Sequence, residues 1–509
     1  MTAFYRKSNK LFSCPNQLEI LSESTLTTNT RGGIDMKKNI LVIADLGGCP
    51  PDMFYKSVAE KYNIISYIPR PFAITKTHAH FIETYSIAII KDPQYFKSIT
   101  DYTHPDSIYW AQEEYNKPED AVVEDIIKIA TMFDVKAITT NNELFILPMA
   151  KACEKLGLRG AGVKAAEKAR DKNLMRESFN ASGIKAIKSR RVTTLDDFKK
   201  AIDYVGVPSV LKPTYLASSI GVTFINDKAT AEDLFLNDKK FLESIDVPKA
   251  VTYKAPFILE EYLEGEYKDW YSEEGYSDYV SVEGMMVNGK YYPLVIHDKT
   301  PQIGFTETAH ITSTILDDDA QKRIITAVSK ANEGLGLEYC STHTEVKLMK
   351  HREVGIIETA ARFAGWNMIP NIKKVYNVDA PQILLDILCD GYSPSLPDKL
   401  LNSPQKYVAD FHLYPENFKQ NGSLPNDLNR IVFKDVILPV NALVGDTQIT
   451  SFETIKKDSN IDLTLFESFN GLAYLELSGS NSHDLAESIH NLQNFSRIII
   501  EEPNHEPVK

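Results

Sequence analysis

The chain contains few cysteines and none of the usual patterns built from them. Its 509 residues include five cysteines, and no two are spaced as Cys-X-X-Cys. An odd and sparse set of this kind argues against a disulfide framework or a zinc site and predicts reduced thiols in a cytoplasmic protein. No apolar run approaches the ~18 residues that a membrane-spanning helix needs.

Basic residues are also in the minority, with 56 Lys and Arg against 69 Asp and Glu, which gives a formal net charge of −13. This charge argues against nucleic acid or an anionic membrane as the main partner. The hydrophobic fraction of 43% and the charged fraction of 25% are ordinary for a globular protein with a normal core. At this length the chain is expected to hold several domains.

The first 35 residues differ from the rest of the chain. Residues 1–35 are polar, rich in Ser, Thr and Asn, and contain no apolar stretch of the kind found in signal peptides. We therefore expect them to form a disordered extension.

Residues 36–163 alternate between short apolar runs and helical patterns. The expected strands cover residues 40–44, 64–68, 87–90 and 137–140, and the expected helices cover 53–61, 121–133 and 147–156. Such alternation is typical of βαβ units and predicts an N-terminal α/β domain with a doubly wound parallel sheet. Ligands of these sheets bind at the carboxyl ends of the strands, where residues 45–48 and 141–143 lie.

The remaining chain falls into two further parts. Residues 164–398 have a mixed α+β pattern and carry nearly all the residues suited to chemistry. After residue 402, four expected strands (407–412, 431–438, 447–452 and 472–478) precede one expected helix (484–495). Few titratable groups in this last part are placed to react, so we interpret it as a small β-rich cap.

Two lysines and a loop of small residues in the middle part suit phosphate binding. Lys172 opens an expected helix, and Lys212 ends a short apolar strand. Either lysine alone is typical of the surface, where an apolar stem carries the ammonium to water. Residues 215–222 follow Lys212 and include Ser218 and Ser219. Small residues there let backbone N–H and hydroxyl donors close over an anion.

An apolar strand that ends in acidic residues follows at residues 256–266. Its backbone groups suit the edge of an adenine, and its carboxylates can accept hydrogen bonds from ribose hydroxyls. Taken alone, the same residues also fit an acidic turn in contact with water.

Two carboxylates come next, on two neighbouring expected strands. Glu345 and Glu358 lie on either side of a turn near residues 350–354, which predicts a hairpin that sets them side by side. Like charges this close repel unless a cation bridges them, and Mg²⁺ combines a few carboxylates with phosphate oxygens. Arg362 follows and can hold a phosphate or a tetrahedral anion with two hydrogen bonds. A surface cluster of ion pairs is the alternative for these three residues.

In order and spacing, these pieces resemble the ATP-grasp superfamily: a lysine, a strand lysine, a small-residue loop, an acidic segment and a Glu…Glu hairpin closed by Arg. The chain departs from the superfamily in one place. Many members have Asn two residues after the second Glu as a further metal ligand, and this chain has Ala360 there. Another group, or water, therefore has to complete the metal shell.

From residue 36 to near the C-terminus, the chain further resembles the bacillary L-amino acid ligases, a family within this superfamily. The resemblance is carried by residues 42–51, 138–145, 297–308 and 361–370. It implies an N-terminal α/β domain followed by a two-lobed ATP-binding domain and a small C-terminal domain. The implied limits are 36–163 for the first domain, 164–257 for the first lobe with its phosphate loop, 258–398 for the second lobe with the metal-binding hairpin, and 399–509 for the C-terminal β-rich domain.

The resemblance also implies roles for single residues. Arg362 is expected to steady the developing anion. The residues expected to bind ATP are Lys172, Lys212, Ser218, Ser219, Glu260, Glu261, Tyr262 and Leu263. Those expected to carry Mg²⁺ are Glu307, Glu345 and Glu358. Those expected to line the amino-acid pockets are Glu143, Leu216, Gln302, His310, Gly365, Trp366 and Met368.

The implied activity is the ATP-dependent joining of two L-amino acids into a dipeptide through an acyl phosphate, with ADP and phosphate released. In this family the first amino acid is small, typically L-alanine. The implied cofactors are ATP and Mg²⁺, with two metal ions expected and Mn²⁺ able to substitute. The expected partners are small-molecule substrates, with neither nucleic acid nor a membrane, and the expected state is a monomer or a homodimer.

Three alternatives remain open. The first is a different ATP-grasp enzyme, such as a carboxylase or a ligase of a nucleotide pathway. The second is a non-catalytic ATP-binding module, which is expected to have lost some of the charged residues above, and none is missing. The third is a broad-specificity dipeptide ligase without a dedicated partner.

Overall fold

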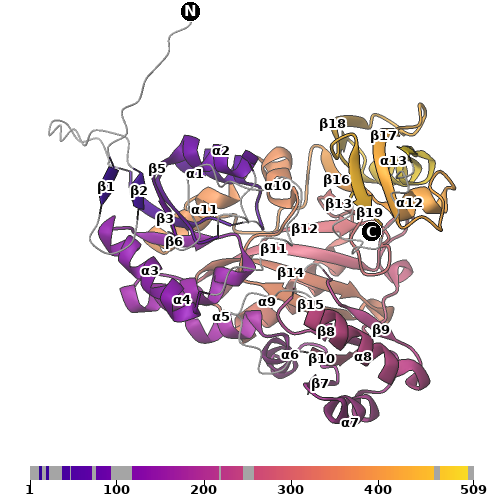
Figure 1. Ribbon diagram of the computed structural model, residues 1–509, viewed down its shortest axis with the longest axis horizontal. Helices are drawn as coiled ribbons and strands as arrows, with labels where there is room; N and C mark the ends of the chain where they lie inside the picture. The colour runs from indigo at the N-terminus through magenta and orange to yellow at the C-terminus, as the bar shows by residue number, and fades with distance from the viewer. Residues whose placement is uncertain are drawn as a thin grey trace, which may run out of the picture.

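The computed structural model describes residues 11–13, 19–21, 37–45, 47–70, 76–92, 117–216, 219–244, 257–463 and 471–501. Within these residues the strands form four sheets, of six, four, eight and three strands. The six-stranded sheet and the lobe with the four-stranded sheet lie against the eight-stranded sheet, which runs through the centre of the molecule (Figure 1). Among the described helices, none combines the length and the hydropathy of a membrane span.

The N-terminal sheet is doubly wound, as the sequence predicts. Its parallel strands are β3 (Asn39–Ile43), β4 (Asn63–Ile68), β5 (Ser86–Lys91) and β6 (Ala137–Thr140), in the order β5-β4-β3-β6. Leu41 and Ile43 pack in one core with helices α3 (Glu119–Met132) and α4 (Ile146–Leu156), whereas Ile40 and Val42 pack in another core with α1 (Pro51–Ala59). Helix α2 (Lys76–Tyr85) lies beside α1. Alternate side chains of one strand thus enter cores on opposite faces of the sheet.

Two short strands lie within the segment that we expected to be disordered. Strand β2 (Glu19–Leu21) pairs antiparallel with the edge strand β5, and β1 (Leu11–Ser13) pairs with β2. At these six residues the expectation of disorder is not met, because an edge strand offers unpaired N–H and C=O groups to any nearby extended segment. The other residues of 1–35 lie outside the described part of the chain.

The first lobe is built on a four-stranded antiparallel sheet in the order β7-β10-β8-β9. Its strands are β7 (Ser189–Val192), β10 (Phe257–Glu261), β8 (Ser209–Pro213) and β9 (Thr223–Ile225), with helices α7 (Leu195–Val205) and α8 (Lys228–Ser244) packed on it. Strand β10 lies between β7 and β8. The expected lobe boundary between residues 257 and 258 therefore differs from the structure, because all of β10 belongs to the first lobe.

The second lobe and the C-terminal segment share one eight-stranded sheet, in the order β15-β14-β11-β12-β13-β16-β20-β18. The second lobe supplies β11 (Tyr279–Val287), β12 (Lys290–Lys299), β13 (Ala309–Thr312), β14 (Cys340–Leu348) and β15 (Val354–Ala360). The C-terminal segment supplies β16 (Tyr407–Leu413), β18 (Gln448–Thr454) and β20 (Ala473–Gly479). The interpretation of residues 399–509 as a separate cap differs from this arrangement, because β16 pairs directly with β13.

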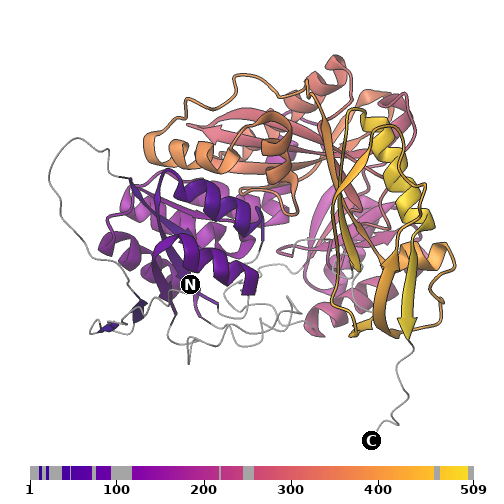
Figure 2. The same cartoon turned by 90° about the horizontal axis from the view of Figure 1, so that it is seen from above.

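Helices cover this large sheet and join the domains. They are α5 (Val163–Arg170), α6 (Lys172–Ala181), α9 (Asp318–Leu335), α10 (Met368–Tyr376) and α11 (Ala380–Asp390). Helix α11 packs against α1 of the N-terminal domain. The C-terminal segment adds α12 (Pro415–Gln420), α13 (Ser482–Phe495) and a small sheet of β19 (Ser459–Asp462), β17 (Arg430–Ile437) and β21 (Arg497–Glu501). In Figure 2 this segment, in orange and yellow, lies at the end of the eight-stranded sheet that its strands β16, β20 and β18 form.

Candidate active site

One face of the eight-stranded sheet carries two rows of polar residues, which include the predicted site residues Glu345, Glu358 and His310. Glu358, Glu345, Ser281, His297 and Thr312 are direct partners across β15, β14, β11, β12 and β13. Two residues further along the strands, a second row joins Lys299, His310, Asp410 and Glu476. Side chains two residues apart on a strand point to the same side, so both rows share one face, which we call the polar face.

The predicted carboxylate hairpin is confirmed. Strands β14 and β15 pair antiparallel, and Glu345 lies directly opposite Glu358. The Lys172 ammonium is 2.9 Å from Glu358 Oε2. Burial raises the pKa of Glu358, but the charges of Lys172 and Lys212 outweigh burial and hold that pKa below its usual value. Glu358 of the hairpin thus interacts with Lys172 at the start of α6 and with the charge of Lys212 in the first lobe.

The start of helix α6 places Lys172. The carboxylate of Asp171 caps this helix by accepting hydrogen bonds from the N–H groups of Asn173 (2.8 Å) and Leu174 (3.3 Å). Lys172 is therefore the first helical residue, and its ammonium also donates to the Leu216 carbonyl at 3.0 Å. This contact joins helix α6 to the start of the phosphate loop.

Lys212 and Glu260 form a buried ion pair across β8 and β10. Lys212 Nζ lies 2.6 Å from Glu260 Oε2, and Arg176 Nε lies 2.8 Å from Glu260 Oε1. Burial raises the pKa of Glu260, but Arg176 and Lys212 outweigh burial and lower it to about 2. Both carboxylate oxygens thus contact a cationic side chain, and Glu260 holds the Lys212 ammonium in place.

This pair predicts a pH-dependent loss of stability in Glu260→Gln. A carboxyl whose folded pKa is depressed stabilises the fold above its unfolded pKa, and that stability is lost as the pH falls through the folded pKa. The lowering from 4.5 to about 2 corresponds to about 3 kcal/mol at pH 7. We expect a lower Tm for the variant at pH 7 and a smaller difference from wild type as the pH falls below about 4.5. Glu264→Gln is the control, because the Glu264 side chain is 68% exposed.

The last residue of β10, Glu261, and the two residues that follow it lie between two hairpins. Glu261 is exposed and accepts a hydrogen bond from the Lys188 N–H at 3.1 Å. The Tyr262 ring meets the Phe224 ring edge-on at a centroid distance of 4.9 Å. Leu263 packs so closely on Gly355 that a Cβ on this glycine would lie 3.0 Å from it. The segment therefore bridges the β8–β9 hairpin and the β14–β15 hairpin.

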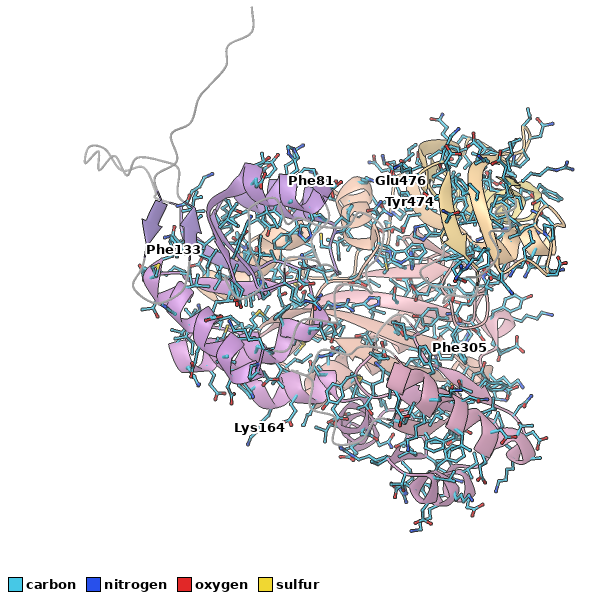
Figure 3. All side chains as sticks on the ribbon, in the orientation of Figure 1. Phe81, Phe133, Lys164, Phe305, Tyr474 and Glu476 are labelled. Carbon is cyan, nitrogen blue, oxygen red and sulfur yellow. The ribbon has the colours of Figure 1, made fainter. Side chains whose placement is uncertain are left out.

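The phosphate loop contacts the loop between β12 and β13. Ser219 has a left-handed backbone with φ of 57°, and its hydroxyl donates to the Phe305 carbonyl at 3.0 Å. Phe305 lies where the eight-stranded sheet faces the first lobe (Figure 3). Gln302 is half-buried in the same β12–β13 loop. Ser218 lies outside the described residues.

Arg362 and Glu143 meet at the carboxyl ends of the N-terminal strands. Glu143 follows β6, and its carboxylate lies 2.7 Å from Arg362 Nε and 3.0 Å from Arg170 Nη1. Burial raises the pKa of Glu143, but Arg362 and Arg170 outweigh it and hold that pKa below its usual value. A Cβ on Gly48 would lie 2.7 Å from the Asn141 carbonyl and 3.1 Å from the Phe363 carbonyl, so only glycine fits this junction.

The carboxylate of Glu307 contacts three side chains of the polar face. Its Oε1 accepts from Tyr279 at 2.5 Å and from Lys299 at 3.0 Å, and its Oε2 is 2.7 Å from His310 Nε2. Burial raises the pKa of Glu307, but Lys299 and His310 hold it well below its usual value. Both oxygens are thus already occupied by donors.

Trp366 lies between two histidines. Its ring is 4.5 Å from the His310 ring and 4.1 Å from the His412 ring, between centroids. The backbone of Trp366 is left-handed, with φ of 54°, which is strained for a large side chain. Gly365 precedes it, and Met368 follows as a buried residue whose sulfur lies 3.6 Å from Ser281 Oγ. Of the predicted pocket residues, Glu143 thus contacts Arg362, Met368 contacts the strand partner of Glu345, and Trp366 contacts His310.

The carboxylates of the site suit a metal ion whose remaining coordination positions are filled by water or phosphate. In the described part of the chain, no three His, Cys, Asp or Glu side chains come together closely enough to hold a metal ion by themselves. Glu307, Glu345 and Glu358 therefore do not form a ready-made site. Two opposed carboxylates fit Mg²⁺, which takes a few protein oxygens and keeps water or phosphate as its other ligands.

Several residues near the site were not predicted from the sequence. Asp410 Oδ2 lies 3.3 Å from His310 Nδ1, and Asp410 Oδ1 accepts from Asn371 at 2.9 Å. Burial lowers the pKa of His412 to about 4, so this ring is neutral at pH 7. Asp410 and His412 belong to an expected strand whose titratable residues we discounted. Their spacing of two was the available signal, because it puts both on one face.

Comparisons with known proteins agree with this fold. The family model of the ATP-grasp domain matches residues 205–369. An alanine–anticapsin ligase of Bacillus subtilis (strain 168) is 63% identical over 462 residues, which cover 91% of this chain and 98% of the relative. The alanine–anticapsin ligase of Bacillus amyloliquefaciens is 62% identical with the same coverage. A solved structure of an L-amino acid ligase from Bacillus licheniformis has a TM-score of 0.68 at 16% identity, over 92% of this chain and 99% of that one.

The fold and the polar face together define an ATP-grasp ligase, an enzyme class that uses ATP. Within that class, the chain belongs to the family of the alanine–anticapsin ligases. The family and fold implied by the sequence motifs are thereby confirmed.

Proposed function

We propose that this ligase joins L-alanine to anticapsin, which gives the dipeptide antibiotic bacilysin, in the cytoplasm and with release of ADP and phosphate. The observation that carries the proposal is the 63% identity to an alanine–anticapsin ligase over 98% of that relative. The charged groups of the site support it, because Lys172, Lys212 and Arg362 lie near the two opposed carboxylates of the hairpin or in contact with the N-terminal domain.

The reaction needs an activated carboxylate. A carboxylate oxygen of alanine attacks the γ-phosphorus of ATP, and the bond to the β,γ-bridging oxygen breaks, which gives an acyl phosphate and ADP. The neutral amine of anticapsin attacks the acyl carbon and loses a proton. The C–O bond of the tetrahedral intermediate then breaks, and phosphate leaves with one oxygen of the original carboxylate.

The first step requires cations around the phosphates. Lys172 and Lys212 lie on the side of the carboxylate hairpin that faces the first lobe, and we assign both to the phosphates of ATP. Glu261, Tyr262 and Leu263 are assigned to adenine and ribose, with Glu260 holding Lys212 in place. We assign Glu345 and Glu358 to Mg²⁺, which offsets phosphate charge when it is bound. Two ions are expected, and Mn²⁺ is expected to substitute.

The second step develops negative charge on the acyl oxygen. Arg362 lies beside Glu143 at the junction of the N-terminal sheet and the second lobe, and we assign it to that anion. Glu143, Leu216, Gln302, His310, Gly365, Trp366 and Met368 are assigned to the amino-acid pockets. Glu307 is assigned to the same pockets, next to His310, because donors already hold both of its oxygens.

The contact between Ser219 and Phe305 supports exclusion of water. It joins the phosphate loop to the loop that carries Gln302 and Glu307. An acyl phosphate hydrolyses unless water is kept out, so loops that meet over the site protect the intermediate. We assign the segment around Ser219 to the cover of the bound phosphates.

The experiment that tests the proposal measures product formation with pairs of amino acids. We expect ADP and phosphate in equal amounts, and rapid turnover only when L-alanine and anticapsin are both present. Formation of AMP and pyrophosphate contradicts the acyl-phosphate reaction. Equal turnover with many second amino acids favours the broad-specificity dipeptide ligase, and turnover with no amino-acid pair favours another ATP-grasp carboxylate ligase.

A further inference from the structure

A buried histidine and a buried glutamate lie beside the carboxylate hairpin and have no part in the function proposed above. His343 precedes Glu345 by two residues on β14, so both side chains lie on the polar face. Glu283 is the direct partner of His343 on the neighbouring strand β11. The two side chains come from different parts of the sequence and meet only through strand pairing.

The pair is tightly held. His343 Nδ1 lies 2.5 Å from Glu283 Oε1, and Glu283 is only 1% exposed. Glu283 Oε2 is buried and has no hydrogen-bond partner among the described residues. A buried carboxylate costs much free energy unless a donor or a cation compensates it. His343 is thus the compensating partner of Glu283.

This hydrogen bond also fixes the direction of the imidazole. Because Nδ1 faces Glu283, the opposite nitrogen, Nε2, faces the hairpin, and it lies 3.8 Å from Glu345 Oε1. That distance is too long for a hydrogen bond but needs only a small movement to become one.

The hairpin leaves room for this ring. The residue directly opposite His343 on β15 is Ala360. Its methyl group fills little of the polar face beside Glu358, two residues earlier on the same strand. The imidazole of His343 is therefore the larger side chain at this pair of positions, next to both carboxylates.

We infer that His343 is a positioning residue for the metal-binding hairpin: Nε2 donates to Glu345 and orients its carboxylate toward the cation, while Glu283 orients the ring. The inference rests on the proposed function, because it takes Glu345 and Glu358 as the carboxylates that hold Mg²⁺. Mg²⁺ favours oxygen ligands, so an oriented carboxylate suits it better than a nitrogen ligand. Loss of a group that orients a metal ligand typically weakens metal affinity by ~10–100-fold.

Two substitutions of His343 distinguish the role of its Nδ1 from the role of its Nε2. In His343→Asn the amide reaches about as far as Nδ1 and keeps the partner of Glu283, whereas in His343→Gln it reaches about as far as Nε2 and keeps the donor to Glu345. We expect the Asn variant of the full chain to bind Mn²⁺ about 10–100-fold more weakly, measured by electron paramagnetic resonance with a nonhydrolysable ATP analogue. We expect the Gln variant to keep most of that affinity and to have a lower Tm without metal.

The controls decide between the possible causes. His78→Asn removes a buried histidine of helix α2 and is expected to leave Mn²⁺ binding unchanged. If His343→Asn fails to fold, the double variant Glu283→Gln/His343→Asn is used, because it also removes the negative charge of Glu283. We expect it to show the same weakening of Mn²⁺ affinity. Wild-type Mn²⁺ affinity in folded His343→Asn, or in the folded double variant, contradicts the inference. Glu345→Gln tests the metal site itself: if it also binds Mn²⁺ like wild type, the metal assignment within the proposed function is wrong.

Discussion

Arg362→Ala is expected to lower kcat by about 100–1,000-fold, the range found when a donor to a developing oxyanion is removed. In the structure, Arg362 Nε is 2.7 Å from Glu143 and Nη1 donates to the Phe363 carbonyl at 2.7 Å. Within the described part of the chain, these two contacts leave Nη2 for the substrate. Steady-state kinetics with L-alanine and anticapsin, with ADP release as the readout, measure the effect.

Two variants control this result. Arg362→Lys keeps the positive charge but loses the planar fork, so we expect a kcat between those of wild type and Arg362→Ala. Arg352→Ala removes a surface arginine that pairs with Asp317, and we expect its kcat to match wild type. A folded Arg362→Ala variant with kcat within about threefold of wild type is incompatible with a role at the developing anion, whose usual contribution is far larger.

Trp366→Ala is expected to widen the choice of the first amino acid. The indole lies between His310 and His412, two residues before the buried Met368. In the proposed pocket it takes up space that a larger first amino acid would need. Each methylene that a pocket accepts or rejects changes discrimination by roughly 1–3 kcal/mol. We therefore expect the ratio of kcat/KM for alanine over leucine to fall by about 10-fold or more on the same principle.

The stability of this variant gives a second readout. A fully buried Trp→Ala change costs about 3–5 kcal/mol, and Trp366 is only partly buried, so we expect a smaller loss. Trp366→Gly also removes the indole but relieves the left-handed backbone, so it is expected to widen specificity at a smaller cost in Tm. Trp366→Phe is expected to change the ratio least. An unchanged ratio in folded Trp366→Ala assigns the indole to packing alone.

Local patterns predicted the parts of the fold that depend on neighbouring residues. Strand β6 has the predicted limits 137–140, and helix α4 begins one residue before the expected helix over 147–156. The hairpin that opposes Glu345 and Glu358 follows from two alternating segments and one turn. Such features are set by periodicity of two or 3.6 residues, which a sequence displays directly.

Contacts between distant segments could not be predicted in this way. The pairing of β16 with β13 makes Asp410 a partner of His310, although the two residues are 100 positions apart. The sequence shows Glu260 as one of several acidic residues after an apolar strand, and only the structure shows that Arg176 and Lys212 occupy both of its oxygens. Both cases depend on which segments fold against each other, and periodicity carries no information about that.

The most direct test of the central claim follows the oxygen of the activated carboxylate. L-Alanine labelled with ¹⁸O in its carboxylate is incubated with ATP, Mg²⁺, anticapsin and the enzyme, and the released phosphate is analysed by mass spectrometry. An acyl phosphate requires one ¹⁸O atom in each phosphate formed, with none in ADP. Phosphate without the label, or label recovered in AMP, contradicts the account.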